Sequence, residues 1–151
     1  MHRFFVSIDN INDDTITLPS NISRQLTYVL RFHPGDRIVV LDNLGWEYIV
    51  VLKKIDRDQV VGLVENRSPV LGEPKTQITL YQGMLKANRF ELILQKCTEL
   101  GVSRFVPLLS KRSIPLQRDE HWFDKRYTRW SRIIMEAAEQ SRRGKIPKLE
   151  K

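Results

Sequence analysis

The sequence predicts an α/β protein of two units, a small β-barrel followed by a parallel α/β layer. Residues 4–66 consist of short β-branched segments separated by turn residues, which is typical of small β-structures. Residues 67–75 contain proline and glycine without periodicity, and the chain then alternates strand-like with helix-like segments. We therefore expect a barrel over 1–68, a linker over 69–75 and the second unit over 76–151.

Short strands and one helix are expected in the first unit. The strands are predicted at residues 3–8, 15–18, 36–42, 47–55 and 59–65. Because Asn, Asp and Gly tolerate turn geometry, the turn residues at 43–45 and 56–58 should join the last three strands as antiparallel hairpins. A helix should follow Pro19 and end at Pro34 and Gly35, and its inward residues are expected to be Ile22, Leu26, Val29 and Leu30.

The second unit has the order strand, helix, strand, helix, which favours parallel pairing. Strands are predicted at 77–84 and 104–109, and helices at 89–100 and about 119–143. In the first helix an apolar stripe runs through Phe90, Ile93, Leu94 and Cys97, and Gly101 ends the helix. The second helix carries a stripe of Phe123, Tyr127, Trp130, Ile134 and Ala137.

A parallel sheet normally needs several neighbouring strands, so the second unit reads as incomplete. Residues 146–151 are where a further strand could begin. This pattern predicts a fragment or truncated product, or a domain that another chain completes.

Composition narrows the class of partner and the compartment. The net charge of +7 and a pI near 9.8 favour a polyanionic partner, with nucleic acid as the leading class. The single cysteine allows no disulfide within the chain, which favours a reducing, cytoplasmic setting. The apolar runs are far shorter than the roughly 20 residues of a membrane span. The three histidines lack ligand spacing, so no metal site is expected.

Charged side chains that core packing does not require mark the candidate functional residues. Lys86, Arg89 and Lys96 lie off the apolar stripe of the first helix. Near the end of the long helix, helical spacing places four polar residues on one side: Glu136, Glu139, Gln140 and Arg143. A further basic face is formed by Lys125, Arg129 and Arg132. This basic face could equally be a solvated helix face.

Several motifs in the same order resemble one family. They are Met1-His2-Arg3-Phe4-Phe5-Val6, Val29-Leu30-Arg31 with Pro34-Gly35-Asp36, Gln95-Lys96-Cys97-Thr98-Glu99-Leu100-Gly101-Val102, Pro107 with Lys111-Arg112-Ser113, and Arg129-Trp130 with Glu136-Ala137-Ala138-Glu139-Gln140-Ser141 and Arg143. They resemble the ribosomal RNA small subunit methyltransferase E family, which methylates N3 of a uridine in 16S rRNA. One departure is that relatives often have a histidine where this chain has Gln25 to Tyr28.

The resemblance implies an architecture and a partner. It implies a PUA-like barrel that binds RNA, followed by a SPOUT-type methyltransferase domain, in a homodimer that acts on 16S rRNA or the small ribosomal subunit. The S-adenosylmethionine pocket of relatives lies in a C-terminal trefoil knot with a Gly-Pro-Glu-Gly-Gly loop, and this loop does not occur here. We therefore expect this chain to lack the cofactor pocket and to be inactive alone.

The resemblance also implies roles for individual residues. Removing the N3 proton of uracil develops negative charge on the base, so cations near the base would favour the reaction. The matching catalytic candidates are Arg112 and Arg143, with Glu139 and Gln140 orienting the base or the arginine. The RNA-binding candidates are Arg3, Arg31, Lys86, Arg89, Lys96 and Arg112.

Two readings of other classes stay open at this point. One is a non-catalytic RNA-binding module. The other is an assembly protein whose basic surface only aids solubility.

Overall fold

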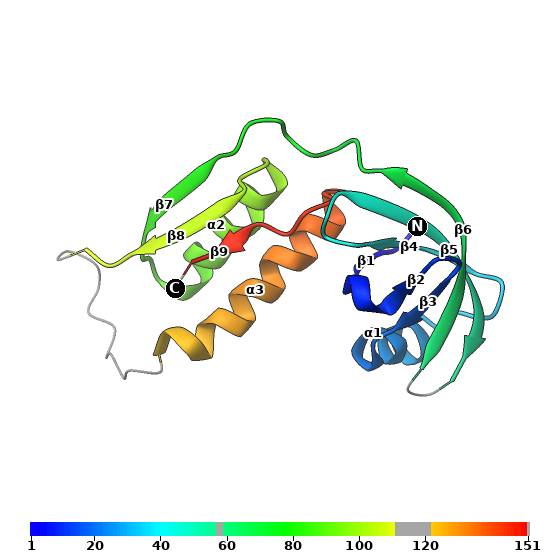
Figure 1. Ribbon diagram of the computed structural model, residues 1–151. Coiled ribbons are helices and arrows are strands. Elements are labelled where there is room, and N and C mark those ends of the chain that lie inside the picture. The colour runs from blue at the N-terminus through cyan, green and yellow to red at the C-terminus, as the bar shows by residue number, and fades with distance from the viewer. Residues whose placement is uncertain (57–58, 111–121, 151) are drawn as a thin grey trace. The chain divides into compact units, whose positions relative to one another are not determined.

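The computed structural model describes residues 1–56, 59–110 and 122–150, which form two compact units, Met1–Leu71 and Gly72–Lys151. Figure 1 shows the elements of each unit. The strands of the first unit are β1 (Arg3–Phe5), β2 (Ile11–Asn12), β3 (Thr15–Leu18), β4 (Arg37–Leu41), β5 (Trp46–Ile55) and β6 (Val60–Pro69). Its helical segments are a 3-10 turn (Ile8–Asn10), α1 (Ser20–Arg24) and a π-helical turn (Gln25–Val29).

The first unit is a curled six-stranded sheet with the order β1-β4-β5-β6-β3-β2. β1 pairs with β4 in parallel, and the other pairs are antiparallel. Among the described residues β1 and β2 do not pair with each other, so the sheet is an open half-barrel with two edges. The predicted antiparallel pairing of the last three strands is confirmed, and β6 runs beyond the predicted end at residue 65 to Pro69.

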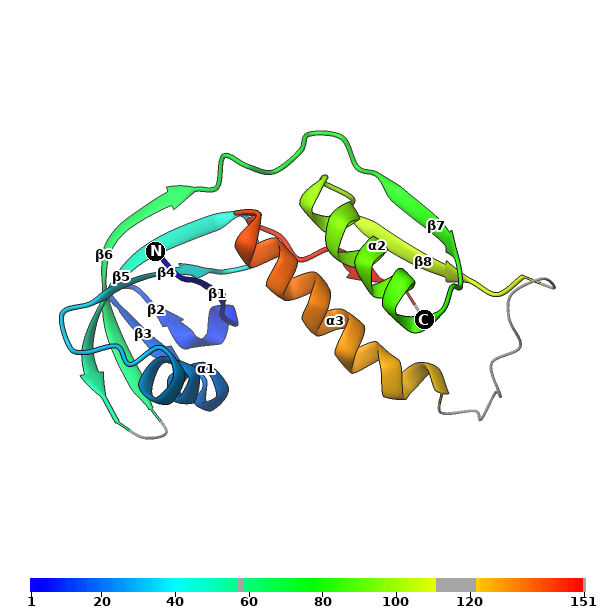
Figure 2. The same cartoon turned by 180° about the vertical axis from the view of Figure 1, so that it is seen from behind.

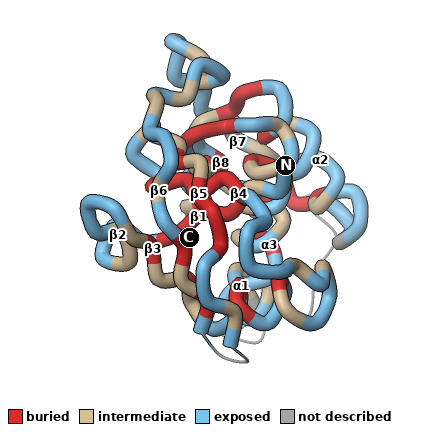
Figure 3. Tube along the Cα trace, turned by 90° about the vertical axis from the view of Figure 1, so that its right-hand side faces the viewer, coloured by how far each residue is buried: buried red, intermediate tan, exposed pale blue. Residues whose placement is uncertain are grey.

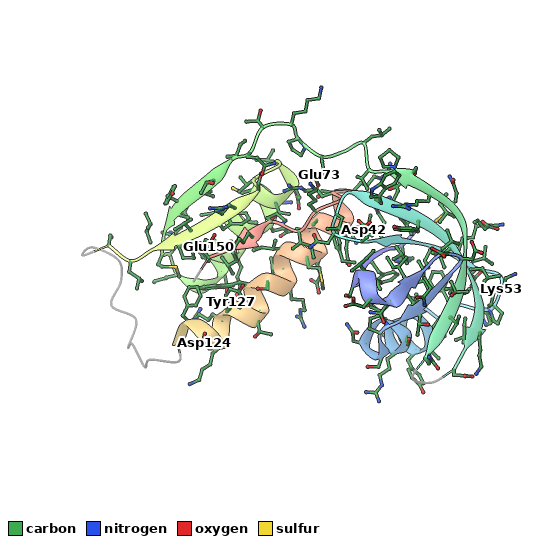
Figure 4. The ribbon with its side chains drawn as sticks, viewed as in Figure 1. Asp42, Lys53, Glu73, Asp124, Tyr127 and Glu150 are labelled. Carbon is green, nitrogen blue, oxygen red and sulfur yellow. The ribbon has the colours of Figure 1, made fainter. Side chains whose placement is uncertain are left out.

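The turn between β4 and β5 is held by the Asp42 carboxylate, which Figure 4 labels. Asp42 Oδ1 accepts hydrogen bonds from the backbone N–H groups of Leu44, Gly45 and Trp46 at 2.7, 3.1 and 3.0 Å. Asn43 and Gly45 adopt positive φ angles of 61° and 111°, which these residue types tolerate. The predicted turn at 43–45 is therefore confirmed, whereas residues 57 and 58 of the other predicted turn lie outside the described residues.

Alternating residues of the strands face one core; Figure 3 colours every buried residue red, those of this core among them. Ile16, Ile38, Val50 and Leu52 are fully buried there. Ile22 and Leu26 contribute from the helical segments, as predicted, and Leu30 packs partly against them. Every second residue of a strand therefore contributes to this core.

Val29 does not face the core, because the helical segment changes its geometry. After α1 the chain forms a π-helical turn, in which the N–H of Leu30 bonds to the carbonyl of Gln25 at 2.9 Å. This wider i→i+5 turn shifts the inward face, and Val29 is 72% exposed. The prediction that Val29 points inward is therefore wrong.

The second unit contains β7 (Thr79–Gly83), α2 (Ala87–Glu99), β8 (Arg104–Leu108), α3 (Trp122–Gln140) and β9 (Lys148–Leu149). Its sheet has the order β7-β8-β9, and both pairs are parallel, as predicted. β9 lies in the segment where a further strand was expected. The two helices pack on one face of the sheet, in front of it in Figure 2.

The predicted apolar stripes of both helices form the core of the second unit. Phe90, Leu94, Trp130 and Ile134 are fully buried. The rings of Phe90 and Trp130 lie with their centroids 4.7 Å apart. Cys97, Phe123 and Tyr127 pack around them and Ala137 is buried, whereas Ile93 is only half-buried and is not part of this cluster. Gly101 ends α2 with φ at 99°, and a Cβ there would lie 2.7 Å from Pro74 Cγ.

The long helix ends at Gln140 and not at Arg143 as predicted. Arg142 adopts a left-handed φ of 60°, and the N–H of Arg143 bonds back to the Ala138 carbonyl at 2.9 Å. This closure resembles a Schellman cap formed without glycine. Arg143 therefore leaves the helical face that carries Glu136, Glu139 and Gln140.

Arg143 turns inward and forms a buried ion pair with Glu73, which Figure 4 labels. The Arg143 side chain is 4% exposed, and its Nε and Nη2 bond to the two carboxylate oxygens of Glu73 at 3.3 and 3.2 Å. Its Nη1 donates to the carbonyls of Thr98 and Val102. Glu73 Oε1 also accepts from the N–H groups of Gly144 and Lys145. We call these contacts the Glu73–Arg143 clamp.

Replacing Glu73 with glutamine should destabilise the second unit by about 3 kcal/mol, because it leaves the Arg143 charge buried without a counter-charge. Urea unfolding followed by the helical circular dichroism signal measures this effect, since α2 and α3 supply most of the helix. The control is Glu99→Gln, which removes an exposed partner of Lys96 and should cost less than about 0.5 kcal/mol. Equal losses for both variants would contradict the role of the clamp.

Replacing Gly62 with alanine should destabilise the first unit by about 1–3 kcal/mol through overpacking. A Cβ at Gly62 would lie 2.3 Å from Val50 Cγ1 and 3.1 Å from the Val51 carbonyl oxygen. Thermal unfolding measures the change. Gly83→Ala is the matched control, because a Cβ there meets nothing within 4 Å; a similar loss in both variants would refute the steric explanation.

Candidate functional site

The two RNA-binding candidates of the first unit, Arg3 and Arg31, differ in solvent exposure and in whether they form an ion pair. Arg3 forms an ion pair with Glu47 on β5, and its side chain is only 14% exposed. Arg31 is exposed, adopts a left-handed φ of 55° and forms no ion pair with the residues that the structure describes. Of these two residues, Arg31 is therefore the one that presents its charge to solvent.

The candidates of the second unit lie along α2. Lys86 directly precedes the helix and Arg89 occupies its first turn; both are exposed, and neither forms an ion pair within the described part of the chain. The first turn has no acidic residue, so the partial positive charge of the helix N-terminus adds to both cations. Lys96 lies seven residues after Arg89 on the same side, but it pairs with Glu99 at 2.9 Å. Of the candidates in the second unit, the two without an ion pair in the described part of the chain therefore lie at the start of α2.

Among the described catalytic candidates, Arg143 does not share the helix face of Glu139 and Gln140, contrary to the sequence prediction. Glu139 is half-buried and Gln140 is exposed at the end of α3, whereas Arg143 is enclosed in the clamp. Arg112 lies outside the described residues. The structure therefore joins Glu139 and Gln140 at one helix end and separates Arg143 from both.

The basic face of α3 is partly neutralised. Arg129 pairs with Glu91 of α2 at 2.7 Å, and this contact raises the pKa of Arg129. Arg132 pairs with Glu136 one turn later at 3.4 Å. These contacts favour the reading of a solvated helix face for these two residues.

Sequence reasoning missed a cluster of side chains on the β5–β6 hairpin. Arg67 lies over the rings of Trp46 and Tyr48, with its guanidinium carbon 4.2 and 5.5 Å from the two centroids. Burial and the nearby Asp42 carboxylate raise the pKa of the Tyr48 hydroxyl. The available signal was the i, i+2 spacing of the two aromatic residues, which places them on one face of a strand. Identifying Arg67 on β6 as their partner requires knowledge of the strand register.

Two kinds of feature are absent within residues 1–56, 59–110 and 122–150. No group of three or more His, Cys, Asp or Glu side chains is placed to hold a metal ion. No helix there has the length and apolar character to cross a membrane.

Comparison with known proteins identifies curated relatives along nearly the whole chain. The Bacillus subtilis ribosomal RNA small subunit methyltransferase E is 29% identical over 99% of this chain and 59% of its own length. The protein of the same name from Synechocystis is 33% identical over 97% of this chain and 46% of its own length. The chain thus spans about half to three fifths of these relatives.

Solved structures match both the sequence and the fold. The ribosomal RNA small subunit methyltransferase E of Neisseria gonorrhoeae, bound to S-adenosyl methionine, has a TM-score of 0.88 and 31% identity, covering 99% of this chain and 60% of that one. A Legionella pneumophila methyltransferase in complex with the cofactor SAM has a TM-score of 0.88 and 26% identity, covering 98% and 61%.

The second unit also matches a protein-family model. The model of an RNA methyltransferase domain matches residues 72–151, which are the second unit. The resemblance noted from the motifs is thereby confirmed, and the chain belongs to the RNA methyltransferase domain family, as a protein of the ribosomal RNA small subunit methyltransferase E type.

Proposed function

We propose that the protein of which this chain forms at least a part methylates N3 of a uridine in 16S rRNA, with S-adenosylmethionine as the methyl donor. The observation that carries this proposal is the match of 99% of the chain to the S-adenosyl methionine-bound Neisseria protein, with a TM-score of 0.88. Both units take part in that match. The proposal includes a cytoplasmic location, a role in ribosome biogenesis and a homodimer.

RNA recognition in this proposal uses both units. The half-barrel serves as a PUA-like module, and its solvent-facing Arg31 contacts phosphate. In the second unit, Lys86 and Arg89 add two unpaired cations at the N-terminus of α2, where the helix dipole also favours an anion. Lys96 and Arg3 contribute less, because each already pairs with a glutamate.

The chemical step needs charge stabilisation on the uracil ring. N3 must pass its proton to water before it attacks, and the resulting negative charge is shared with the two carbonyl oxygens of the base, O2 and O4. S-adenosylmethionine supplies an electrophilic methyl group when it is bound. We assign Arg112 to the developing negative charge, and Glu139 and Gln140 to orienting the base. Arg143 acts as a positioning residue, because its guanidinium is occupied by Glu73 and two carbonyl oxygens and holds the end of α3.

The cofactor pocket belongs, in this proposal, to a part of the family fold that the chain does not span. The chain covers 60% of the Neisseria protein, and the family resemblance places the pocket in a C-terminal SPOUT knot. The 151 residues alone are then inactive in methyl transfer.

Isothermal titration tests the placement of the pocket. The chain of 151 residues should show no measurable binding of S-adenosylmethionine. A version extended at its C-terminus by the knot segment of the Neisseria protein should bind at micromolar concentration, in the usual range of about 1 μM to 1 mM for enzyme substrates. Tight binding by the short chain would refute this placement.

Substitution in such an extended protein tests the residue roles. Arg112→Ala should lower kcat by about 100-fold or more, the scale seen when one group that stabilises developing charge is removed. Gln140→Ala should lower kcat less. The control is Lys54→Ala on the first unit, where the Lys54 side chain pairs with nearby Asp56. The readout is turnover of radiolabelled methyl onto 16S rRNA, and an unchanged kcat in Arg112→Ala would remove that assignment.

A further inference from the structure

Arg67 lies over Trp46 and Tyr48 at the edge of the core of the first unit, and of these three side chains only Tyr48 belongs to that core. Tyr48 and Arg67 face each other across the β5–β6 pair, and Trp46 lies two residues before Tyr48 on the same face. The guanidinium carbon of Arg67 is 4.2 Å from the indole centroid and 5.5 Å from the phenol centroid. Both distances are within the range of cation–π attraction.

The charge of Arg67 is not neutralised by a carboxylate. Two other arginines of the same sheet pair with glutamates, Arg3 with Glu47 and Arg37 with Glu65. Arg67 forms no ion pair with any residue in the ranges that the structure describes. The Asp42 carboxylate below Tyr48 is already occupied, since it accepts three backbone N–H groups and the Tyr48 hydroxyl at 3.4 Å.

The cluster combines a buried side chain with a partly exposed one. Tyr48 is 4% exposed and packs in the core, whereas Trp46 is 38% exposed. The turn before Trp46 is held by Asp42, whose bond to the Trp46 N–H is 3.0 Å long. The indole and the guanidinium therefore present an aromatic group and a positive charge side by side at the surface.

We propose that Trp46 and Arg67 bind an unpaired nucleobase of RNA, which stacks on the indole–guanidinium pair while Arg67 contacts the neighbouring phosphate. Aromatic rings and arginine planes are the surfaces on which proteins stack single-stranded bases. This site rests on the proposed function, because it assumes that the protein acts on RNA. It adds a base-binding position to the phosphate contacts already assigned.

The combination of side chains favours RNA over other partners. A site for phosphate alone requires cations and gains nothing from an exposed indole. An apolar protein surface would leave the Arg67 charge without a counter-charge when it covered the site. An unpaired nucleotide offers both a π-face and an anion within one residue.

Fluorescence polarisation of labelled RNA tests the site. The probes are a short single-stranded RNA and an abasic ribose-phosphate strand of the same length, at low salt. Trp46→Ala should weaken binding of the base-bearing RNA about 10-fold, within the range for loss of one stacked base, and leave the abasic strand unchanged. Trp46→Phe keeps a ring and should retain most of the affinity. Arg67→Gln should weaken the binding of both probes, with the larger loss for the base-bearing RNA.

The matched control is Lys53→Gln, which removes the same charge from the same sheet. Lys53 is exposed, and it lies on β5 at the end away from Asp42 (Figure 4). This variant should weaken both probes equally and by less than about twofold, as expected for one distant phosphate contact.

Two results would overturn the site. One is a wild-type chain that binds the abasic strand as tightly as the base-bearing RNA. The other is an equal loss for both probes in Trp46→Ala. If that variant unfolds, quenching of tryptophan emission decides: base-bearing RNA should quench the wild type more than Trp46→Phe, and equal quenching would overturn the site. Neither readout uses methyl transfer, so failure of the proposed enzyme activity stays distinguishable.

Discussion

The buried charge of Arg143 constrains how three segments of the second unit meet. A guanidinium that is 4% exposed must have its donors satisfied and its charge balanced, because an unpaired buried charge costs several kcal/mol. Glu73 balances the charge, and the carbonyls of Thr98 and Val102 accept from Nη1. Three segments far apart in sequence are thereby held at one point: the first residues of the unit, the end of α2 and the end of α3.

This constraint propagates to the parts of the unit proposed to contact substrate. Thr98 and Val102 flank Gly101, where the chain leaves α2 and turns toward β8, so the clamp fixes the direction of that turn. On the other side it fixes the closure after Gln140, which sets where Glu139 and Gln140 are presented. A residue without substrate contact can in this way control the geometry of residues that have it.

Local periodicity was sufficient for most elements of the fold, and it failed where tertiary contacts decide. The stripes through Phe90 and Trp130 gave the helices and their buried faces, and the turn at Asn43 and Gly45 gave the hairpin. The predicted end of α3 was wrong, because no glycine marks the position where the helix stops. The buried pairing of Arg143 stabilises the left-handed conformation of Arg142, which local preference disfavours. The prediction that Val29 points into the core was wrong, because a π-helical turn shifts the inward face of the helix and the sequence gives no signal of such a turn.

The candidate site was less predictable than the fold, because net charge does not say which cations are free. Arg3, Lys96, Arg129 and Arg132 all pair with glutamates, and such pairs remove much of their attraction for a polyanion. Arg31, Lys86 and Arg89 keep their charge, and Arg67 keeps its charge above two aromatic rings. Strand register and helix spacing determine this division. The surface that we propose to bind RNA is therefore smaller and more localised than a formal charge of +7 implies, and the proposed role of its aromatic part is to distinguish bases from phosphate.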